Sequence, residues 1–242
     1  MGVKISIITV CRNSAKTVGK TIDSVIDQNY ADVEHIIIDG ASTDETLQVV
    51  NDHLKRAPYQ YSIVSEPDNG IYDAMNKGIR LATGDLICML NSDDWLEDGA
   101  LKTVDDNYNG EDYLVIYGME RRIRDDKEVG CFLYGHELIP ERSLAHQACY
   151  VTKKVYDRFG VYETGYRSAG DHEFFLRLYM SSEVDFRPVY KILANFREGG
   201  MTATSIGHLE DAKVRRKYGV ITGKQYTYLF IRALLLKILK RC

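Results

Sequence analysis

The chain has 242 residues, 45% of them hydrophobic and 27% charged, which is the balance of an ordinary globular protein with one large core. Its five cysteines are widely spaced and contain no C-x-x-C pair, so neither a disulfide framework nor a zinc site is indicated. No signal-peptide pattern opens the chain and no apolar run has the length of a membrane span, so we expect a cytoplasmic protein. The formal net charge is −4, yet residues 208–242 hold nine basic and two acidic side chains, so a basic tail follows an acidic body. We expect no nucleic-acid partner.

The first hundred residues alternate between strand and helix patterns. The expected strands lie at 3–10, 33–39, 61–65 and 85–90, and the expected helices at 14–28, 44–57 and 70–82. Continuous apolar runs such as Ile36-Ile37-Ile38 suit strands that are buried on both faces of a sheet. The pattern predicts an α/β fold with a mostly parallel central sheet and helices on both faces.

The pattern becomes mixed after about residue 100. It predicts a helix at 98–107, a strand at 113–117, a hairpin turn at Asp125-Asp126, and helices at 152–159 and 171–182. No low-complexity linker or internal repeat marks a second domain. We therefore expect one domain over residues 1–205, followed by a basic amphipathic helical tail at 206–242.

Polar clusters follow each of the first four predicted strands, at 9–13, 39–44, 66–70 and 91–95. In parallel α/β sheets, ligands bind beyond the carboxyl ends of the strands. Each cluster alone also fits turn chemistry, since Ser42 with Glu45 forms a capping-box pattern. Several acidic clusters at one sheet edge would repel one another unless a cation or a polar ligand lay between them, so the sequence predicts a metal site.

The adjacent carboxylates Asp93 and Asp94 are the sharpest metal candidates. Paired carboxylates at a strand end hold a hard cation such as Mg²⁺ or Mn²⁺, which leaves coordination positions for water and substrate phosphates. A diphosphate ligand follows from that preference. Neither G-x-x-x-x-G-K-[ST] nor G-x-G-x-x-G follows the first strand, which counts against ATPase and dinucleotide-binding functions.

These motifs, taken together, resemble the family 2 glycosyltransferases of GT-A fold, and most closely the small bacterial enzymes of capsule, O-antigen and colanic-acid type polysaccharide assembly. The matching segments are Thr9-Val-x-x-Asn13, Asp39-Gly-x-Ser-x-Asp-x-Thr46, Glu66 to Ile79, Gly84-Asp85, Asn91-Ser-Asp-Asp-Trp95, His146-Gln147, Ala169 to Leu178 and Gly199-Gly-Met-Thr202. The resemblance covers residues 3–205. It implies a nucleotide-binding half at 1–97 and an acceptor half at 98–205.

The resemblance also implies roles for individual residues. Those implied for the nucleotide-sugar are Thr9, Asn13, Asp39, Asp68, Asp73, Asn76, Lys77 and Asp93. Asp93 is expected to face the ribose or the diphosphate and Asp94 the metal, with Asn91 standing where the family's Asp-x-Asp element begins. An Asp73–Lys77 surface ion pair remains an alternative. His146 and Gln147 match the family's acceptor side.

Asp171 is the candidate general base. It opens a helix beside the apolar positions Phe174, Phe175 and Leu178, where desolvation is expected to raise the pKa of its carboxyl group. The alternative is a plain helix N-cap. The family usually has Glu or Ala before this aspartate, whereas this chain has Gly170.

The segment 226–242 combines a leucine-rich helix pattern with four basic residues near its end. It is too short and too charged to span a bilayer, so we expect an amphipathic helix lying on an anionic membrane surface. Packing on the protein's own core or on a second copy in a homo-oligomer remains the alternative. The first interpretation places the protein peripherally on the cytoplasmic face of a membrane.

The function implied by the resemblance is an inverting, metal-dependent transfer of a hexosyl or N-acetylhexosaminyl group. The donor would be a UDP-sugar, the acceptor a lipid-linked saccharide or oligosaccharide, and the pathway surface polysaccharide biosynthesis. Two alternatives remain: a nucleotidyltransferase that makes a nucleotide-sugar, and an inactive scaffold or glycan-binding protein.

Overall fold

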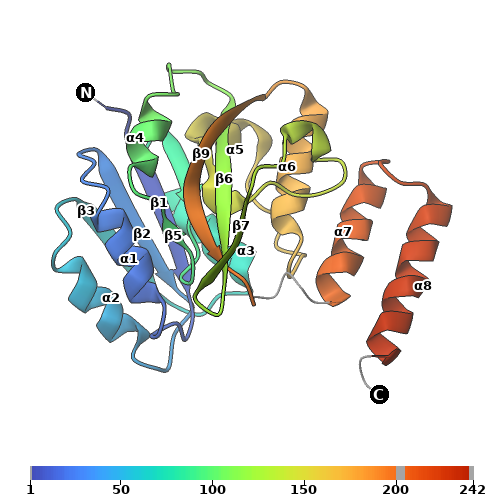
Figure 1. Ribbon diagram of the computed structural model, residues 1–242, viewed down its shortest axis with the longest axis horizontal. Helices are drawn as coiled ribbons and strands as arrows, with labels where there is room; N and C mark the ends of the chain where they lie inside the picture. The colour runs from blue at the N-terminus through green and yellow to red at the C-terminus, as the bar shows by residue number, and fades with distance from the viewer. Residues whose placement is uncertain (1, 200–204, 240–242) are drawn as a thin grey trace.

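The computed structural model describes residues 2–199 and 205–239, with side chains placed for 2–199 and 207–233. Figure 1 shows a central curved sheet with helices on both faces. The elements of the first half are β1 (Ile5–Cys11), α1 (Val18–Ile26), β2 (Val33–Asp39), α2 (Thr46–Leu54), β3 (Gln60–Ser65), α3 (Ile71–Leu81), β4 (Leu86–Met89), β5 (Trp95–Leu96) and α4 (Ala100–Asp105). The remaining elements are β6 (Leu114–Arg124), β7 (Lys127–Phe132), the 3₁₀ turns η1 (His136–Leu138) and η2 (His146–Ala148), β8 (Cys149–Thr152), α5 (Lys153–Phe159), α6 (Gly170–Ser181), β9 (Asp185–Arg197), α7 (Ser205–Lys217) and α8 (Gly223–Leu239).

Over the described residues the sheet has nine strands in the order β3-β2-β1-β4-β8-β6-β9-β5, with β7 paired to β6. The pairs among β1, β2, β3 and β4 are all parallel. Beyond β4 the sheet is mixed, because β8 runs antiparallel to β4 and β6 while β6 and β9 are parallel. The carboxyl ends of β1, β2, β3 and β4 therefore meet at one edge, as the sequence predicted.

Buried strands divide the interior into layers on the two faces of the sheet. Every residue of β1 is buried, and its side chains alternate between faces: Ile5 and Ile7 join one apolar cluster, Ile8 and Val10 another. The second cluster includes residues of α3 and α6. Burial on both faces explains why this strand is a continuous apolar run.

The structure confirms the predicted strands and helices of the first hundred residues within a few positions. It also confirms the hairpin at Asp125-Asp126, where both residues have positive φ, as a two-residue I′ turn requires. The sequence patterns did not identify β5, β8 or the 13-residue β9. Helix α7 lies in the segment predicted as a helical tail.

The buried face of α3 includes two residues that carry polar groups. Tyr72 and Asn76 are both buried. Tyr72 joins the apolar cluster beneath the sheet, and Asn76 bonds to the backbone of a distant loop. The buried face of α3 is thus wider than its aliphatic residues indicate.

The two C-terminal helices form a hairpin beside α6. In Figure 1, α7 lies next to α6, and α8 packs on the outer side of α7. In the part of the chain that the structure describes, none of the helices combines the length and apolarity needed to cross a bilayer. The predicted motif at Gly200 to Thr202, and the basic residues Lys240 and Arg241, lie outside the described residues.

Candidate active site

Hydrogen bonds join the loops that follow β1, β2 and β4. The backbone N–H of Asn13 donates to Ser42 Oγ at 2.8 Å, and Asn13 Oδ1 accepts from the backbone N–H of Thr43 at 2.9 Å. Ser92 after β4 donates to the Ser14 hydroxyl at 2.9 Å. These loops form one continuous surface at the sheet edge, and Asn13 is an exposed member of it.

Two residues predicted to contact the nucleotide are enclosed within the protein instead. Asp39 has 0% exposure, and its carboxylate accepts hydrogen bonds from Ser42 and from the Ser65 hydroxyl at 2.6 Å. Thr9 also has 0% exposure, and its hydroxyl lies 2.9 Å from Nε2 of His35. In this structure neither side chain is open to a ligand, and Asp39 instead ties the ends of β2 and β3 together.

The loop after β3 brings Asp68 against the end of β2. A Cβ on Gly40 would lie 2.4 Å from an Asp68 carboxylate oxygen, so a larger residue there would displace the Asp68 side chain. Asp73, in the first turn of α3, accepts from the backbone N–H of Asn69 at 3.0 Å. Asp68 and Asp73 therefore shape this loop, and both remain partly exposed.

Lys77 is held inside the same segment. Its Nζ donates to the carbonyl of Pro67 at 2.8 Å and pairs with Glu66 at 2.9 Å. Asp73, the partner considered from the sequence, lies at 3.9 Å. The ammonium group thus fixes the β3–α3 loop in this structure, and the nucleotide-sugar contact implied for Lys77 stays a prediction.

Asn76 lies apart from the sheet edge. Its amide donates to the carbonyl of Tyr162 at 2.8 Å and accepts from the N–H of the same residue at 3.0 Å, across 86 residues of sequence. Its side chain is buried. In this structure both ends of the Asn76 amide hold the loop at Tyr162, and the nucleotide contact stays a prediction.

Asp93 and Asp94 have different environments although they are neighbours. Asp94 has 0% exposure, and its Oδ1 accepts from the backbone N–H of Arg197 at 3.1 Å. Burial, with the adjacent Asp93 charge, raises the pKa of Asp94 well above its ordinary value. Asp93 is partly exposed, and burial raises its pKa as well. Asp93 is the carboxylate that reaches the surface.

The residues at this strand end fit a hard divalent cation. Among the described residues, the buried oxygens Asp94 Oδ2 and Asn91 Oδ1 have no hydrogen-bond partner, and no group of three His, Cys, Asp or Glu side chains could hold a metal. Mg²⁺ and Mn²⁺ bind through one or two carboxylates and take the rest of their ligands from water and substrate phosphates. Asp93 and the buried Asp94 next to it supply these one or two carboxylates.

Asp171 lies in the first turn of α6, close to this strand end. Its carboxylate accepts from the Tyr72 and Ser143 hydroxyls, both at 3.3 Å, and lies 3.4 Å from Nδ1 of His146. Nε2 of the same histidine is 3.0 Å from the amide nitrogen of Asn91. His146 therefore connects Asp171 to the residue that opens the predicted metal motif.

The structure removes the alternative role of Asp171 and corrects the expected direction of its pKa shift. The helix N-cap is Ala169, so Asp171 is not the cap. Burial favours a higher pKa for its carboxyl group, but the hydrogen bond and charge of His146 outweigh burial and lower the pKa. For His146, burial alone would lower the pKa, whereas Asp171 raises it. Asp171 is thus an ionised carboxylate beside a histidine that its charge favours in the protonated form.

The glycine before Asp171 has a steric cause. A Cβ at Gly170 would lie 2.7 Å from the ring of Tyr72. The Tyr72 ring occupies the space that the family's Glu or Ala side chain would need, and its hydroxyl reaches Asp171. Gly170 therefore replaces the family's Glu or Ala at a position where the Tyr72 ring leaves no room for a side chain.

Only one of the two predicted acceptor-side residues reaches the site. His146 does, but Gln147 is buried and its amide donates to Glu120 Oε2 at 2.7 Å. Sequence analysis missed Tyr72 and Ser143 as neighbours of Asp171. Tyr72 falls inside the matched segment 66–79, which was its only signal, and Ser143 had none.

Comparisons with known proteins show the family to which the chain belongs. The model of "Glycosyl transferase family 2" matches residues 6–161. A PGL/p-HBAD biosynthesis glycosyltransferase of Mycobacterium bovis is 30% identical over 205 residues, which are 83% of this chain and 80% of the relative. The chondroitin synthase of Escherichia coli is 28% identical over 79% of this chain and 28% of its own length.

Solved structures match the fold. TarS 1–349 of S. aureus in complex with UDP-GlcNAc has a TM-score of 0.72 at 16% identity, covering 93% of this chain and 69% of TarS 1–349. The mannosyltransferase PcManGT of Pyrobaculum calidifontis, in complex with GDP-Man and Mn²⁺, has a TM-score of 0.69 at 14% identity, covering 96% and 70%. These matches confirm the expected GT-A fold. The family match sets aside the nucleotidyltransferase and inactive-scaffold alternatives. The chain belongs to glycosyl transferase family 2 and is a glycosyltransferase of glycan biosynthesis.

Proposed function

We propose that this glycosyltransferase is metal-dependent, takes a UDP-sugar as donor and transfers the sugar with inversion to a lipid-linked saccharide. The observation that carries the proposal is the line of contacts from Asn91 through His146 to Asp171. It brings a carboxylate of the acceptor half beside the strand end that bears Asp93. One surface then offers a donor-side and an acceptor-side acidic group.

Asp171 would accept the acceptor proton. Its lowered pKa keeps the carboxylate ionised at neutral pH, which is the form that can take a proton. The acceptor oxygen forms a bond to the anomeric carbon, the bond from that carbon to the diphosphate oxygen breaks, and UDP leaves with the electron pair. Tyr72 and Ser143 hold the carboxylate in place during the transfer.

Asp93 would hold a Mg²⁺ or Mn²⁺ ion, with the enclosed Asp94 behind it. When bound, this ion supplies positive charge to the leaving diphosphate. The relatives support metal and nucleotide-sugar use in general terms, because one solved neighbour contains UDP-GlcNAc and another contains GDP-Man with Mn²⁺. The loop residues Asn13, Asp68 and Asp73 are the partly or fully exposed groups available to the nucleotide.

The test is a screen of UDP-glucose, UDP-galactose, UDP-N-acetylglucosamine and GDP-mannose, with octyl glycosides as acceptors, in Mn²⁺, Mg²⁺ or EDTA. We expect release of UDP coupled to glycoside extension, and loss of both in EDTA. Release of GDP alone would overturn the UDP assignment. Full turnover in EDTA would overturn the metal role.

The C-terminal helix supports a membrane location for the acceptor. On α8, the side chains of Tyr228 and Ile231 are 65% and 54% exposed, and the neighbouring Arg232 is exposed too. Apolar side chains beside cations suit an interface with anionic lipid. We extend the proposal to peripheral binding on such a membrane, where a lipid-linked acceptor is found.

Liposome sedimentation tests this extension. The full chain should sediment with phosphatidylglycerol vesicles and much less with phosphatidylcholine vesicles, whereas a chain ending at residue 222 should stay in the supernatant with both. UDP affinity should be equal in the two proteins. Equal sedimentation of both proteins would mean that α8 packs on the protein and does not bind the membrane. A decrease in the molecular mass of the assembly on truncation would indicate that α8 holds a homo-oligomer together.

A further inference from the structure

Helix α7 contacts α6 at three places that surround Asp171. The contacts reach the turn before α6, the residue after Asp171, and Glu173 one position further on. Asp171 faces Tyr72, Ser143 and His146 instead. The first turn of α6 is thus held by α7 on one side and carries the candidate base on the other.

Glu210 on α7 makes the first contact. Its carboxylate accepts hydrogen bonds from the backbone N–H groups of Arg167 at 3.0 Å, Ser168 at 2.8 Å and Ala169 at 3.2 Å. Ala169, the N-cap residue, makes no side-chain cap hydrogen bond to α6 in the described structure. A single carboxylate 41 to 43 residues away therefore fixes the chain where it enters the helix.

Asp211 makes the second contact, through His172. The Nδ1 atom of this buried histidine lies 2.5 Å from an Asp211 carboxylate oxygen, and Nε2 lies 2.7 Å from the carbonyl oxygen of Ile139. Both neighbours are hydrogen-bond acceptors, so the ring satisfies both by donating from each nitrogen. These two contacts anchor the chain at His172, directly after Asp171.

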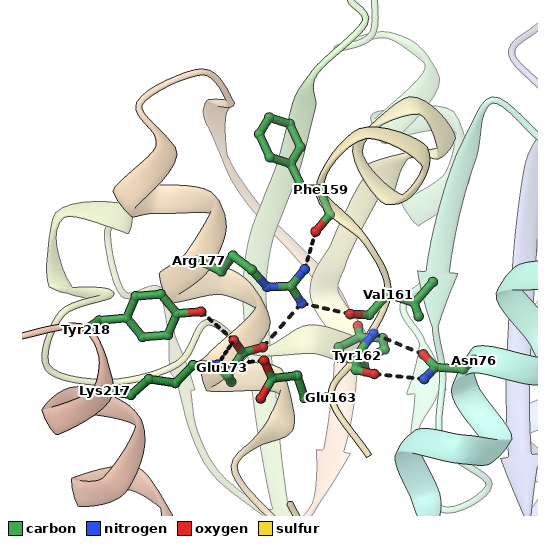
Figure 2. Close-up of polar contacts among 9 residues, drawn as sticks. All are labelled: Asn76, Phe159, Val161, Tyr162, Glu163, Glu173, Arg177, Lys217 and Tyr218. Carbon is green, nitrogen blue, oxygen red and sulfur yellow. Dashed lines mark hydrogen bonds and ion pairs between the residues drawn. The ribbon is translucent and has the colours of Figure 1, made fainter. Parts of the chain in front are cut away.

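Glu173 completes the set, as Figure 2 shows. This carboxylate has 0% exposure and accepts from Lys217 at 3.0 Å and from the Tyr218 hydroxyl at 2.5 Å. Arg177, one turn along α6, reaches Glu173 at 3.2 Å and also donates to the carbonyl of Val161 at 2.7 Å. The same loop is held from α3 by Asn76, so α3, α6 and α7 form one bonded unit.

We propose that Glu210 is a positioning residue for Asp171: it fixes the turn at 167–169 and so the direction in which the Asp171 carboxylate meets the acceptor. This inference rests on the proposed function of Asp171 as base. It assigns α7, expected from the sequence to belong to a separate tail, to the catalytic unit. Small displacements of a catalytic group have large effects on turnover, so loss of this anchor should lower kcat.

A double-mutant cycle tests the inference. Glu210→Gln removes the charge that three N–H groups share, and we expect kcat to fall on the order of tenfold or more while the donor KM and the UDP Kd stay within about twofold. In the Asp171→Asn background the same substitution should cause no further loss, because its effect passes through the carboxylate. Glu210→Asp keeps the charge and should recover part of kcat. The exposed Asp157→Asn on α5 is the matched control and should leave kcat unchanged.

Hydrogen exchange of the free protein gives an independent readout. Glu210→Gln should speed exchange of the amides of residues 167–173, and Asp157→Asn should not. Equal losses of kcat in both Asp171 backgrounds, or parent turnover together with faster exchange, would overturn the positioning role. Parent turnover by Asp171→Asn alone would instead overturn the base assignment, so the two failures are distinct.

Discussion

The two halves of the molecule use their polar residues in different ways. In residues 1–97, the motif side chains of Asp39, Asn76 and Lys77 bond mainly to their own loops and to the protein backbone. In the second half, His146 and Asp171 bond to each other and to residues from other elements at a shared surface. The difference shows that some motif residues hold the loops of a site in shape, whereas others face the shared surface of that site.

The largest expected effect is that of Asp171→Asn. The substitution keeps size and polarity but removes basicity, so kcat should fall by about a hundredfold or more. UDP affinity and the melting temperature should stay near the parent values, because Ala169 is the helix N-cap. Turnover is measured with saturating donor and metal. Near-parent kcat would move the base role elsewhere, with His146 as the first alternative.

The neighbouring carboxylates Asp93 and Asp94 are expected to differ in how much each contributes to metal binding. Asp93→Ala should abolish the strengthening of UDP binding by Mn²⁺, because its partly exposed carboxylate is the one that reaches the surface. The matched variant Asp94→Ala should retain a larger share of the metal effect and lose more stability, since its buried oxygen holds the N–H of Arg197. Calorimetric titration of UDP with and without Mn²⁺ decides the order. The reverse order would make Asp94 the principal ligand.

If Asn76 has a structural role, its replacement should lower the stability of the protein and leave its UDP affinity unchanged. Asn76→Ala leaves the buried N–H and carbonyl of Tyr162 without their partners, which costs about 1–3 kcal/mol in the free energy of unfolding. The exposed Asn69→Ala is the control. Urea denaturation measures both variants. A weakened UDP affinity with unchanged stability would restore the nucleotide contact predicted from the sequence.

The smallest expected effect is a pH dependence of stability that arises from His172. Burial works against its charged form, but Asp211 outweighs burial and raises the pKa of the ring. A raised pKa contributes stability that is fully present below the unfolded value of about 6.5 and is lost as pH rises through the higher folded value. Urea midpoints between pH 5.5 and 9 should therefore decline in the parent and decline less in Asp211→Asn. Parallel profiles would exclude His172 as the source.

Local patterns were sufficient to predict the sheet edge. Apolar runs fixed β1, β2 and β4, and the polar residues that follow them meet because parallel strands end together. The turn at Asp125-Asp126 was equally local. These features depend on neighbours within a few residues, so composition and spacing reveal them.

The contacts around Asp171 and Asn76 depend on partners that are distant in sequence. The pKa of Asp171 was predicted in the wrong direction because His146, 25 positions earlier, lies beside it only after folding. Asn76 was assigned to a ligand because its partner, Tyr162, is 86 residues away. Glu210 showed no pattern at all, since its partners are backbone N–H groups.

The location of the metal-bound donor tests the account most directly. Crystals grown with UDP and Mn²⁺ give an anomalous signal at the ion. We expect a peak at the Asp93 carboxylate, with the terminal phosphate of UDP on the side of the site that faces His146 and Asp171. A manganese peak remote from Asp93, or a diphosphate directed away from Asp171, would contradict it.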